Sequence, residues 1–139
     1  MPEGYAAVIG THNAFSPADR SVLNSIISAY TEKKLCEVSY TGAQKWQNVN
    51  INEDFSESKG EIIAIFQGHD HRDAVNTTTY PVPCITITTA GADIRDENSE
   101  ERIPGTTTET ALDIVTIDRE NRKIYLTRLG VGEDRVVEY

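Results

Sequence analysis

The chain alternates short apolar runs with polar segments, and this pattern predicts a small mixed α/β protein. Runs of strand length cover residues 5–11 (YAAVIGT), 61–67 (EIIAIFQ) and 84–91 (CITITTAG). Each of the first two runs ends directly at a histidine-containing loop. The third run is rich in β-branched residues, which favour strands.

One helix is predicted after the first run. Ser16 suits the N-cap, Pro17 suits the first helical position, and Asp19 adds an acid to the first turn. We expect the helix to continue to about Lys34, with Lys33 and Lys34 interacting favourably with the negative end of its dipole. Apolar residues recur mostly at spacings of three and four, so one face should pack against a sheet. That face comprises Val22, Leu23, Ile26, Ile27, Tyr30 and Leu35.

The remaining segments predict loops and a hairpin. Residues 36–60 mix turn signals with weak alternation, which predicts loop with one strand, and residues 91–108 predict a solvated loop. The segments ALDIVTID (111–118) and RKIYLTRL (122–129) alternate apolar and polar positions around a polar turn. This alternation predicts a β-hairpin, in whose turn Asn121 is able to take the left-handed conformation.

Length and charge narrow the class of protein. The 139 residues suffice for a single domain, 1–139, with a hydrophobic core. A net charge of -9 argues against general nucleic-acid binding and favours attraction of metal cations. No apolar run approaches the roughly 20 residues that cross a bilayer, and no signal-type segment opens the chain, so we expect a cytoplasmic protein without a membrane partner.

The two cysteines predict no disulfide and no catalytic thiol. Cys36 and Cys84 belong to no CxxC pair or dense cysteine framework, so both are expected to be reduced. Cys84 opens an apolar run and is expected to act as a small buried hydrophobe.

The three histidines of the chain, His12, His69 and His71, predict a metal site. Parallel strands 5–11 and 61–67 would bring all three to the same rim of a sheet, where ligands gather in α/β proteins. Imidazole is a good ligand for zinc, iron and nickel. The alternative is that GHxH is a chance pairing of surface histidines. We expect Asp70 and Asp73 to be solvated turn residues rather than ligands.

The segments AAVIGTHN and IIAIFQGHDH together resemble the calcineurin-like metallophosphoesterases. Members of that family hold two metal ions with the motifs DxH, GDxx, GNH[D/E], a lone histidine and GHxH. By position, His12 resembles the lone histidine, and His69 and His71 resemble the pair. The resemblance implies a partial αββα sandwich with mixed sheets, one long helix and a C-terminal β-hairpin.

The C-terminal segment 109–139 also resembles the terminal hairpin of bacterial and phage-encoded members, so the chain resembles the C-terminal half of such a domain. Asp113 and Arg128 are charged positions in this hairpin, and we expect both to be structural or exposed rather than functional.

The carboxylate-bearing motifs DxH, GD and GNH do not occur in the sequence. A two-metal phosphoesterase needs a bridging carboxylate to hold its ions together, and three neutral histidines would bind two divalent cations weakly. We therefore expect Met1 to begin a fragment, a truncated reading frame or one half of a split protein. A complete site would hold two divalent ions of Mn, Zn, Fe or Ni.

Three functions remain open from the sequence. The first is a portion of a metal-dependent phosphoester hydrolase that uses metal-activated water and is weakly active or inactive alone. The second is a non-catalytic binding or assembly module with a vestigial or mononuclear histidine site. The third is an unrelated mononuclear zinc enzyme with three histidine ligands. The partners expected are a phosphoester substrate and either identical chains or a missing N-terminal half.

Overall fold

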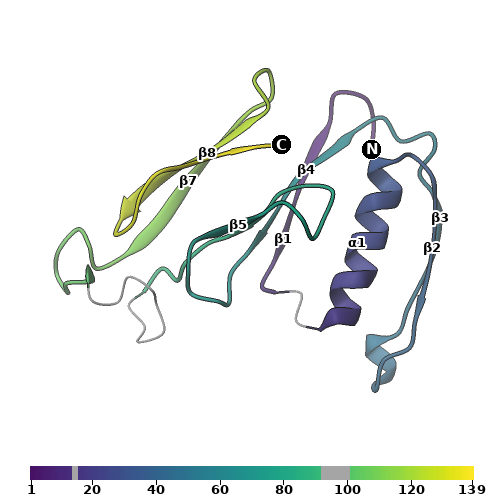
Figure 1. Ribbon diagram of the computed structural model, residues 1–139, viewed down its shortest axis with the longest axis horizontal. Helices are drawn as coiled ribbons and strands as arrows, with labels where there is room; N and C mark the ends of the chain where they lie inside the picture. The colour runs from purple at the N-terminus through teal and green to yellow at the C-terminus, as the bar shows by residue number, and fades with distance from the viewer. Residues whose placement is uncertain (14–15, 92–100) are drawn as a thin grey trace.

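In the computed structural model, which describes residues 1–13, 16–91 and 101–139, one α-helix and three β-sheets form a mixed α/β fold (Figure 1). The first sheet has the strand order β1-β4-β6-β5, the second pairs β2 with β3, and the third has the order β7-β8-β9. The elements are β1 (Ala6–Thr11), α1 (Pro17–Thr31), β2 (Leu35–Tyr40), the 3₁₀ turn η1 (Lys45–Gln47), β3 (Val49–Asp54), β4 (Glu61–Gln67), β5 (Ala74–Asn76), β6 (Cys84–Thr86), β7 (Ala111–Asp118), β8 (Lys123–Gly130) and β9 (Arg135–Glu138).

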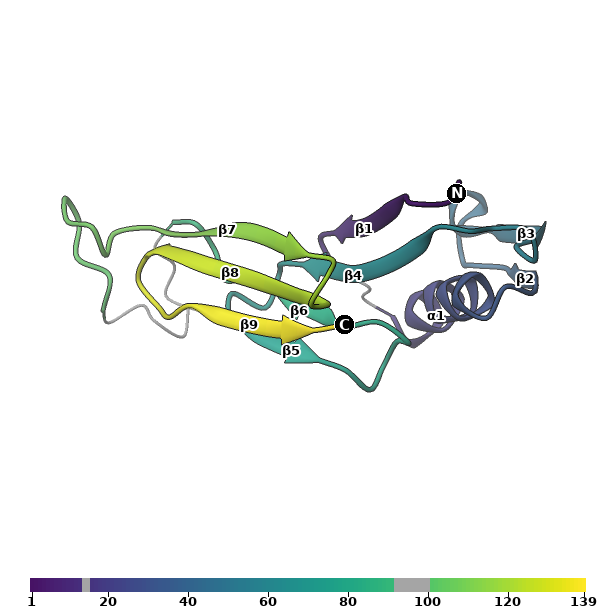
Figure 2. The same ribbon diagram turned by 90° about the horizontal axis from the view of Figure 1, so that it is seen from above.

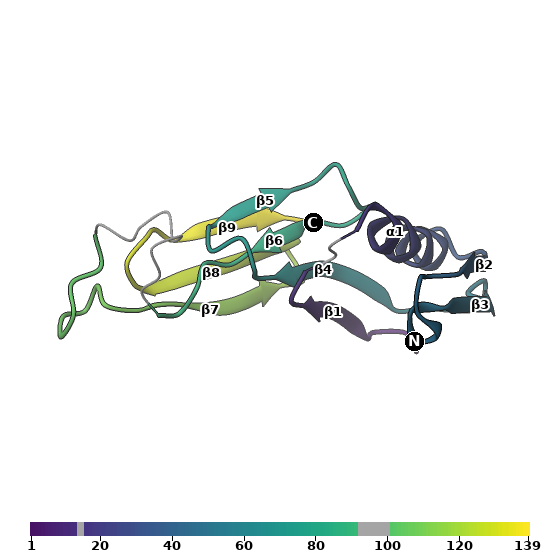
Figure 3. The same cartoon turned by 90° about the horizontal axis from the view of Figure 1, so that it is seen from below.

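The first sheet is sandwiched between α1 and the third sheet. On one face, Ile27 of α1 packs with Ile65 and Cys84. On the other face, Ile124 and Leu126 of β8 pack with strands β4 and β6. Figure 2 shows the third sheet in front of β5 and β6 and Figure 3 shows it behind them, and both views show the β2–β3 hairpin beyond α1 at one end of the molecule. The predicted α/β class is therefore confirmed.

Strands β1 and β4 lie side by side and run parallel, as the sequence predicts. Their register shifts once, because Ala7 lies opposite Ile62 whereas Val8 lies opposite Ala64. Ile63 is the extra residue of this β-bulge. As a result Ile63 and Ala64 both pack toward the third sheet, while Ile65 packs toward α1.

Helix α1 begins where the sequence predicts and ends earlier. Ser16 Oγ accepts a hydrogen bond from the Asp19 backbone N–H at 3.0 Å, and Asp19 accepts one from the Ser16 N–H at 3.1 Å. This reciprocal cap fixes the first turn. The helix stops at Thr31, so the prediction that Lys33 and Lys34 lie in its last turn is wrong. Lys33 instead adopts a left-handed backbone (φ 54°), and its Nζ donates to the Gly60 carbonyl at 2.7 Å. Within the described residues, no helix is long and apolar enough to cross a membrane.

Several strand predictions need correction. Residues 36–60 form two strands rather than one, because β2 and β3 pair as an antiparallel hairpin. Leu35, predicted on the helix face, opens β2 and is exposed. The strand expected over 84–91 covers only Cys84–Thr86. The short strands β5 and β9 were not predicted. Part of the predicted solvated loop, residues 92–100, lies outside the described residues.

The C-terminal hairpin is confirmed over its whole length, since β7 and β8 pair from Ala111 with Gly130 to Asp118 with Lys123. Its left-handed residue is Arg122 (φ 52°) rather than Asn121. Asn121 is held by Asp118, whose side chain accepts hydrogen bonds from both the backbone and side-chain nitrogens of Asn121.

The outer face of the third sheet is apolar and exposed. The pairing puts Leu112 opposite Leu129, and Tyr125 opposite Val136, on the face turned away from the core. Ile114 adds a further exposed side chain between them. These five residues are called the outer apolar face below.

Replacing an isoleucine on each face of the third sheet measures which face is buried in solution. Ile124→Ala should lower the free energy of unfolding by about 2–5 kcal/mol because it opens a cavity in the core. The matched variant Ile114→Ala should lower it by no more than about 0.5 kcal/mol. Urea denaturation at low protein concentration measures both. Equal losses would contradict this assignment of faces.

Candidate metal centre

Strands β1 and β4 deliver two of the three predicted histidines to one place. β1 ends at Thr11 and β4 at Gln67, and the Gly68 backbone N–H donates to the His12 carbonyl at 3.0 Å. The His12 Nε2 and His69 Nδ1 atoms lie 3.1 Å apart, and the two rings meet edge-to-face with centroids separated by 5.0 Å. The parallel pairing thus joins two side chains that are 57 positions apart in the sequence.

His71 follows in the same loop and is half-buried, whereas His12 and His69 are exposed. Across the described ranges 1–13, 16–91 and 101–139, no group of three or more His, Cys, Asp or Glu side chains is placed to hold a metal ion. The His12–His69 contact is therefore the part of the predicted cluster that is formed. Metal coordination by His12, His69 and His71 stays a prediction.

The loop that carries His69 and His71 is strained. Both residues have positive φ, 82° for His69 and 51° for His71. Residues with a Cβ rarely adopt a positive φ. Each residue in this backbone conformation costs about 1–3 kcal/mol of conformational energy, which the surrounding structure must offset. Strain of this kind is concentrated at ligand-binding and catalytic positions.

A buried ion-pair network holds this loop against the third sheet. Asp73 accepts a hydrogen bond from Arg128 Nη2 at 2.6 Å and lies 3.0 Å from Arg135 Nη2. The oxygen that lies near Arg135, Asp73 Oδ1, also accepts from the Thr88 backbone N–H at 3.1 Å, whereas Arg128 bonds to Oδ2. The Asp73 side chain is 15% exposed. The prediction that it is a solvated turn residue is therefore wrong.

Asp113 completes the network from β7. It accepts hydrogen bonds from Arg128 Nε at 2.8 Å and from Arg135 Nη2 at 2.7 Å. The side chains of Asp113 and Arg128 are 1% and 2% exposed, so they are structural, as one of the two predicted alternatives states. Burial alone would lower the pKa of Arg128, but the hydrogen bonds and charges of Asp113 and Asp73 outweigh it and raise that pKa.

The sequence contained a signal for this network. In the hairpin, inward-facing positions alternate with outward-facing ones, and Asp113 and Arg128 fall on the inward series with Ala111, Ile124 and Leu126. A charge at such a position must be paired, because an isolated buried charge is too costly. Asp73 could not be recognised in the same way, since it lies in a loop.

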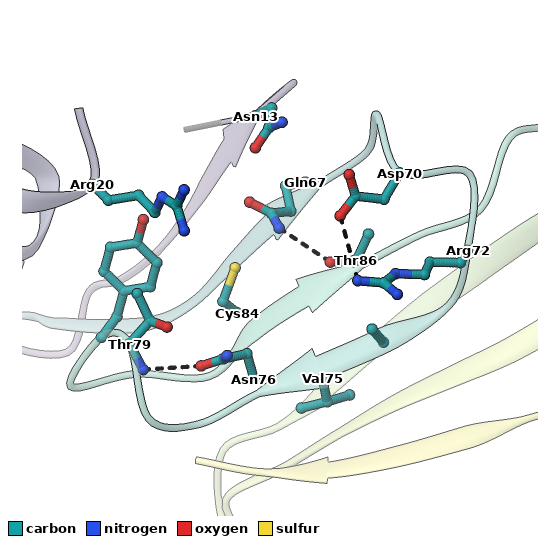
Figure 4. A pocket seen from close by; sticks show the side chains of 12 residues that line it. Asn13, Arg20, Gln67, Asp70, Arg72, Val75, Asn76, Thr79, Cys84 and Thr86 are labelled. Carbon is teal, nitrogen blue, oxygen red and sulfur yellow. Dashed lines mark hydrogen bonds and ion pairs between the residues drawn. The ribbon is translucent and has the colours of Figure 1, made fainter. Parts of the chain in front are cut away.

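A pocket of about 380 Å³ lies beside the histidine loop (Figure 4). Burial raises the pKa of the Cys84 thiol on its wall, so Cys84 is a protonated, poor nucleophile, as the sequence predicts. Burial also raises the pKa of Tyr80, with Cys84 adding to the shift and Arg20 opposing it. The pocket is lined by Asn13, Arg20, Gln67, Asp70, Arg72, Ala74, Val75, Asn76, Thr79, Tyr80, Cys84 and Thr86.

The chain matches no known family model, no curated protein and no solved structure.

Breaking the buried network should destabilise the protein strongly. Arg128→Met removes the cation that pairs with both Asp73 and Asp113, and we expect the free energy of unfolding to fall by about 3–5 kcal/mol. Urea denaturation monitored by circular dichroism gives the value.

The double variant Arg128→Met/Asp113→Leu provides the control, because it also removes the carboxylate that the single variant leaves buried. It should recover part of the lost stability. A loss below about 1 kcal/mol for Arg128→Met would mean that the network is solvated.

Proposed function

We propose that this protein contributes the histidine metal ligands of a phosphoester hydrolase site, and that it acts in the cytoplasm. The observation that carries the proposal is the 3.1 Å approach of His12 Nε2 to His69 Nδ1 at the ends of two parallel strands. Support comes from the order of the motifs, a strand ending in His12 and a second strand ending in Gly68-His69-Asp70-His71.

The geometry of the pair fits a shared metal ion. Two nitrogen ligands at about 2.1 Å from one ion lie about 3.0–3.4 Å apart at octahedral or tetrahedral angles. The observed separation of 3.1 Å falls in that range. Both imidazoles are exposed, so an ion can reach them from solvent.

His12 and His69 would hold the ion, with His71 as a third ligand from the same loop. When bound, divalent metal lowers the pKa of a water molecule and neutralises charge on a phosphoryl oxygen. The chain's own groups supply the nitrogen ligands and keep them in place. The Asp73 network fixes the end of the loop, and the Gly68 N–H bond to His12 joins the two strand ends.

Within ranges 1–13, 16–91 and 101–139, carboxylates are the ligands that the structure supplies least well. Asp73 is engaged by Arg128 and Arg135, which leaves Asp70 as the other acid of this loop. Asp70 is exposed and lies 3.9 Å from Arg72. We therefore propose that a bridging carboxylate comes from a second polypeptide, either an identical chain or a separate segment, and that activity depends on it.

The competing function is a non-catalytic module with one histidine-held metal. It needs only the two imidazoles that meet at 3.1 Å, those of His12 and His69. The two functions differ in metal stoichiometry: two ions per assembled site for the hydrolase and one for the module.

Metal titration tests the centre itself. Isothermal titration with Zn²⁺ or Mn²⁺ should show saturable binding by the wild type that is lost in His12→Ala and His69→Ala. Asn50→Ala, a change at an exposed residue of β3, should bind as the wild type does. The variant His69→Gly also removes the imidazole but should be about 1 kcal/mol more stable than His69→Ala, because glycine tolerates φ 82°.

Turnover of a chromogenic phosphodiester completes this test. The chain alone should hydrolyse little or none of it with Mn²⁺, Zn²⁺ or Ni²⁺ present, because the sequence lacks the DxH, GD and GNH motifs that would supply a bridging carboxylate. Robust turnover that disappears in His71→Ala would contradict the need for a second polypeptide, with Asp70 as the first suspect. Metal binding that survives both His12→Ala and His69→Ala would refute the centre.

The surface of the protein favours a partner. β1 forms an edge of the first sheet with Val8 exposed, and the outer apolar face leaves five large side chains in solvent. Unpaired strand edges and contiguous apolar patches are typical of interaction surfaces.

Light scattering should accordingly find an assembly larger than the 15.4 kDa monomer at micromolar concentration. Val8→Lys, at the β1 edge, and Leu129→Lys, on the outer apolar face, should each shift that equilibrium toward monomer. Asn50→Lys adds the same charge elsewhere and serves as the control. A stable wild-type monomer at all concentrations would contradict self-association.

A further inference from the structure

The pocket beside the histidine loop has polar walls and two cationic side chains. Asn13 follows His12 in the chain, and Asp70 and Arg72 flank His71, yet the histidines themselves are not part of the wall. The loop thus lines the pocket with Asp70 and Arg72 and not with His69 or His71. A ligand in this pocket would contact residues other than the metal ligands.

Arg20 and Arg72 give the pocket a positive charge in a protein whose net charge is -9. Figure 4 shows them on opposite sides, with Gln67, Cys84 and Thr86 between them. Arg20 forms no ion pair with any described residue. Arg72 has only a 3.9 Å approach to Asp70, and both of these side chains are well exposed. Such an exposed pair is weak and leaves Arg72 able to bind another anion.

Hydrogen bonds fix the orientation of two amides in the wall. Asn76 Oδ1 accepts from the backbone N–H groups of Thr78 and Thr79, at 3.0 Å and 2.9 Å. Its amide NH₂ group is thereby the donor left for a ligand. Gln67 Nε2 donates to Thr86 Oγ1 at 3.1 Å, which leaves Gln67 Oε1 as an acceptor. The pocket therefore offers donors from Arg20, Arg72 and Asn76 and an acceptor from Gln67.

We propose that this pocket binds a small organic phosphate, with Arg20 and Arg72 holding the phosphate group. A phosphate presents several oxygens in different directions and can accept from donors on both sides of the pocket, whereas a carboxylate presents two oxygens in one plane. The volume of about 380 Å³ exceeds that of the phosphate group alone and leaves room for a polar organic part against Gln67 and Asn76.

This binding requires no metal, because the pocket wall contains none of the three histidines. It therefore goes beyond the proposed hydrolase site and can be tested separately from it. Failure of metal binding would leave the phosphate pocket standing, and failure of phosphate binding would leave the histidine centre standing.

The test is a titration of the full chain with inorganic phosphate, ribose 5-phosphate and acetate in metal-free buffer, followed by amide chemical shifts. Ribose 5-phosphate should bind more tightly than inorganic phosphate, and acetate should bind at least about tenfold more weakly than phosphate. Arg20→Gln and Arg72→Gln should each weaken phosphate binding about tenfold or more, the loss expected for a charge-assisted contact. Asp70→Asn should strengthen it, since it removes the one acidic side chain among the described residues of the wall.

Arg119→Gln is the matched control. It changes the net charge by the same amount, but Arg119 pairs with Glu61 at the other end of β4. Phosphate affinity should stay at the wild-type value in this variant. An equal loss in Arg119→Gln would overturn the proposal in favour of nonspecific charge attraction. Absence of saturable phosphate binding by the wild type, or acetate binding as tight as phosphate, would overturn it as well.

Discussion

The two ion pairs that Arg128 and Arg135 form with Asp73 are the constraint on which the arrangement of the site depends. Two strands of the third sheet supply the arginines, and the histidine loop supplies the carboxylate. Because Asp113 lies between the same two arginines, the charges of two carboxylates and two guanidinium groups balance. The loop can then keep two histidines in a backbone conformation that would relax in isolation.

The elements that could be predicted are those that a short stretch of sequence is enough to indicate. The Ser16 cap, the parallel strands β1 and β4, and the β7–β8 hairpin each depend on residues close in sequence or on one regular alternation. The meeting of His12 with His69 followed from the rule that ligands collect at the ends of parallel strands. The early end of α1 could not be predicted in this way, because Lys33 leaves the helix to bind the Gly60 carbonyl, a tertiary contact.

The parts that were missed are stabilised by contacts distant in sequence. Strand β5 is three residues long and exists through its pairing with β6, and β9 through its pairing with β8. Asp73 resembles any loop acid until the third sheet is placed against it. The pocket is likewise assembled from α1, β4, β5 and β6, so its two arginines come together only in the folded chain.

The bulge at Ile63 changes how the sequence of β4 must be interpreted. Before it, residues on even positions face α1; after it, Ile65 and Gln67, on odd positions, lie on that side. Deleting Ile63 would restore a regular ladder with β1 and a strict alternation, in which Ile62 and Ile65 still face α1 and Ala64 still faces the third sheet, and the core would lose the Ile63 side chain. One residue thus determines which positions of β4 face the helix on each side of the bulge. In any comparison or redesign of this segment, the positions that face α1 must be assigned separately for residues 61–62 and for residues 64–67.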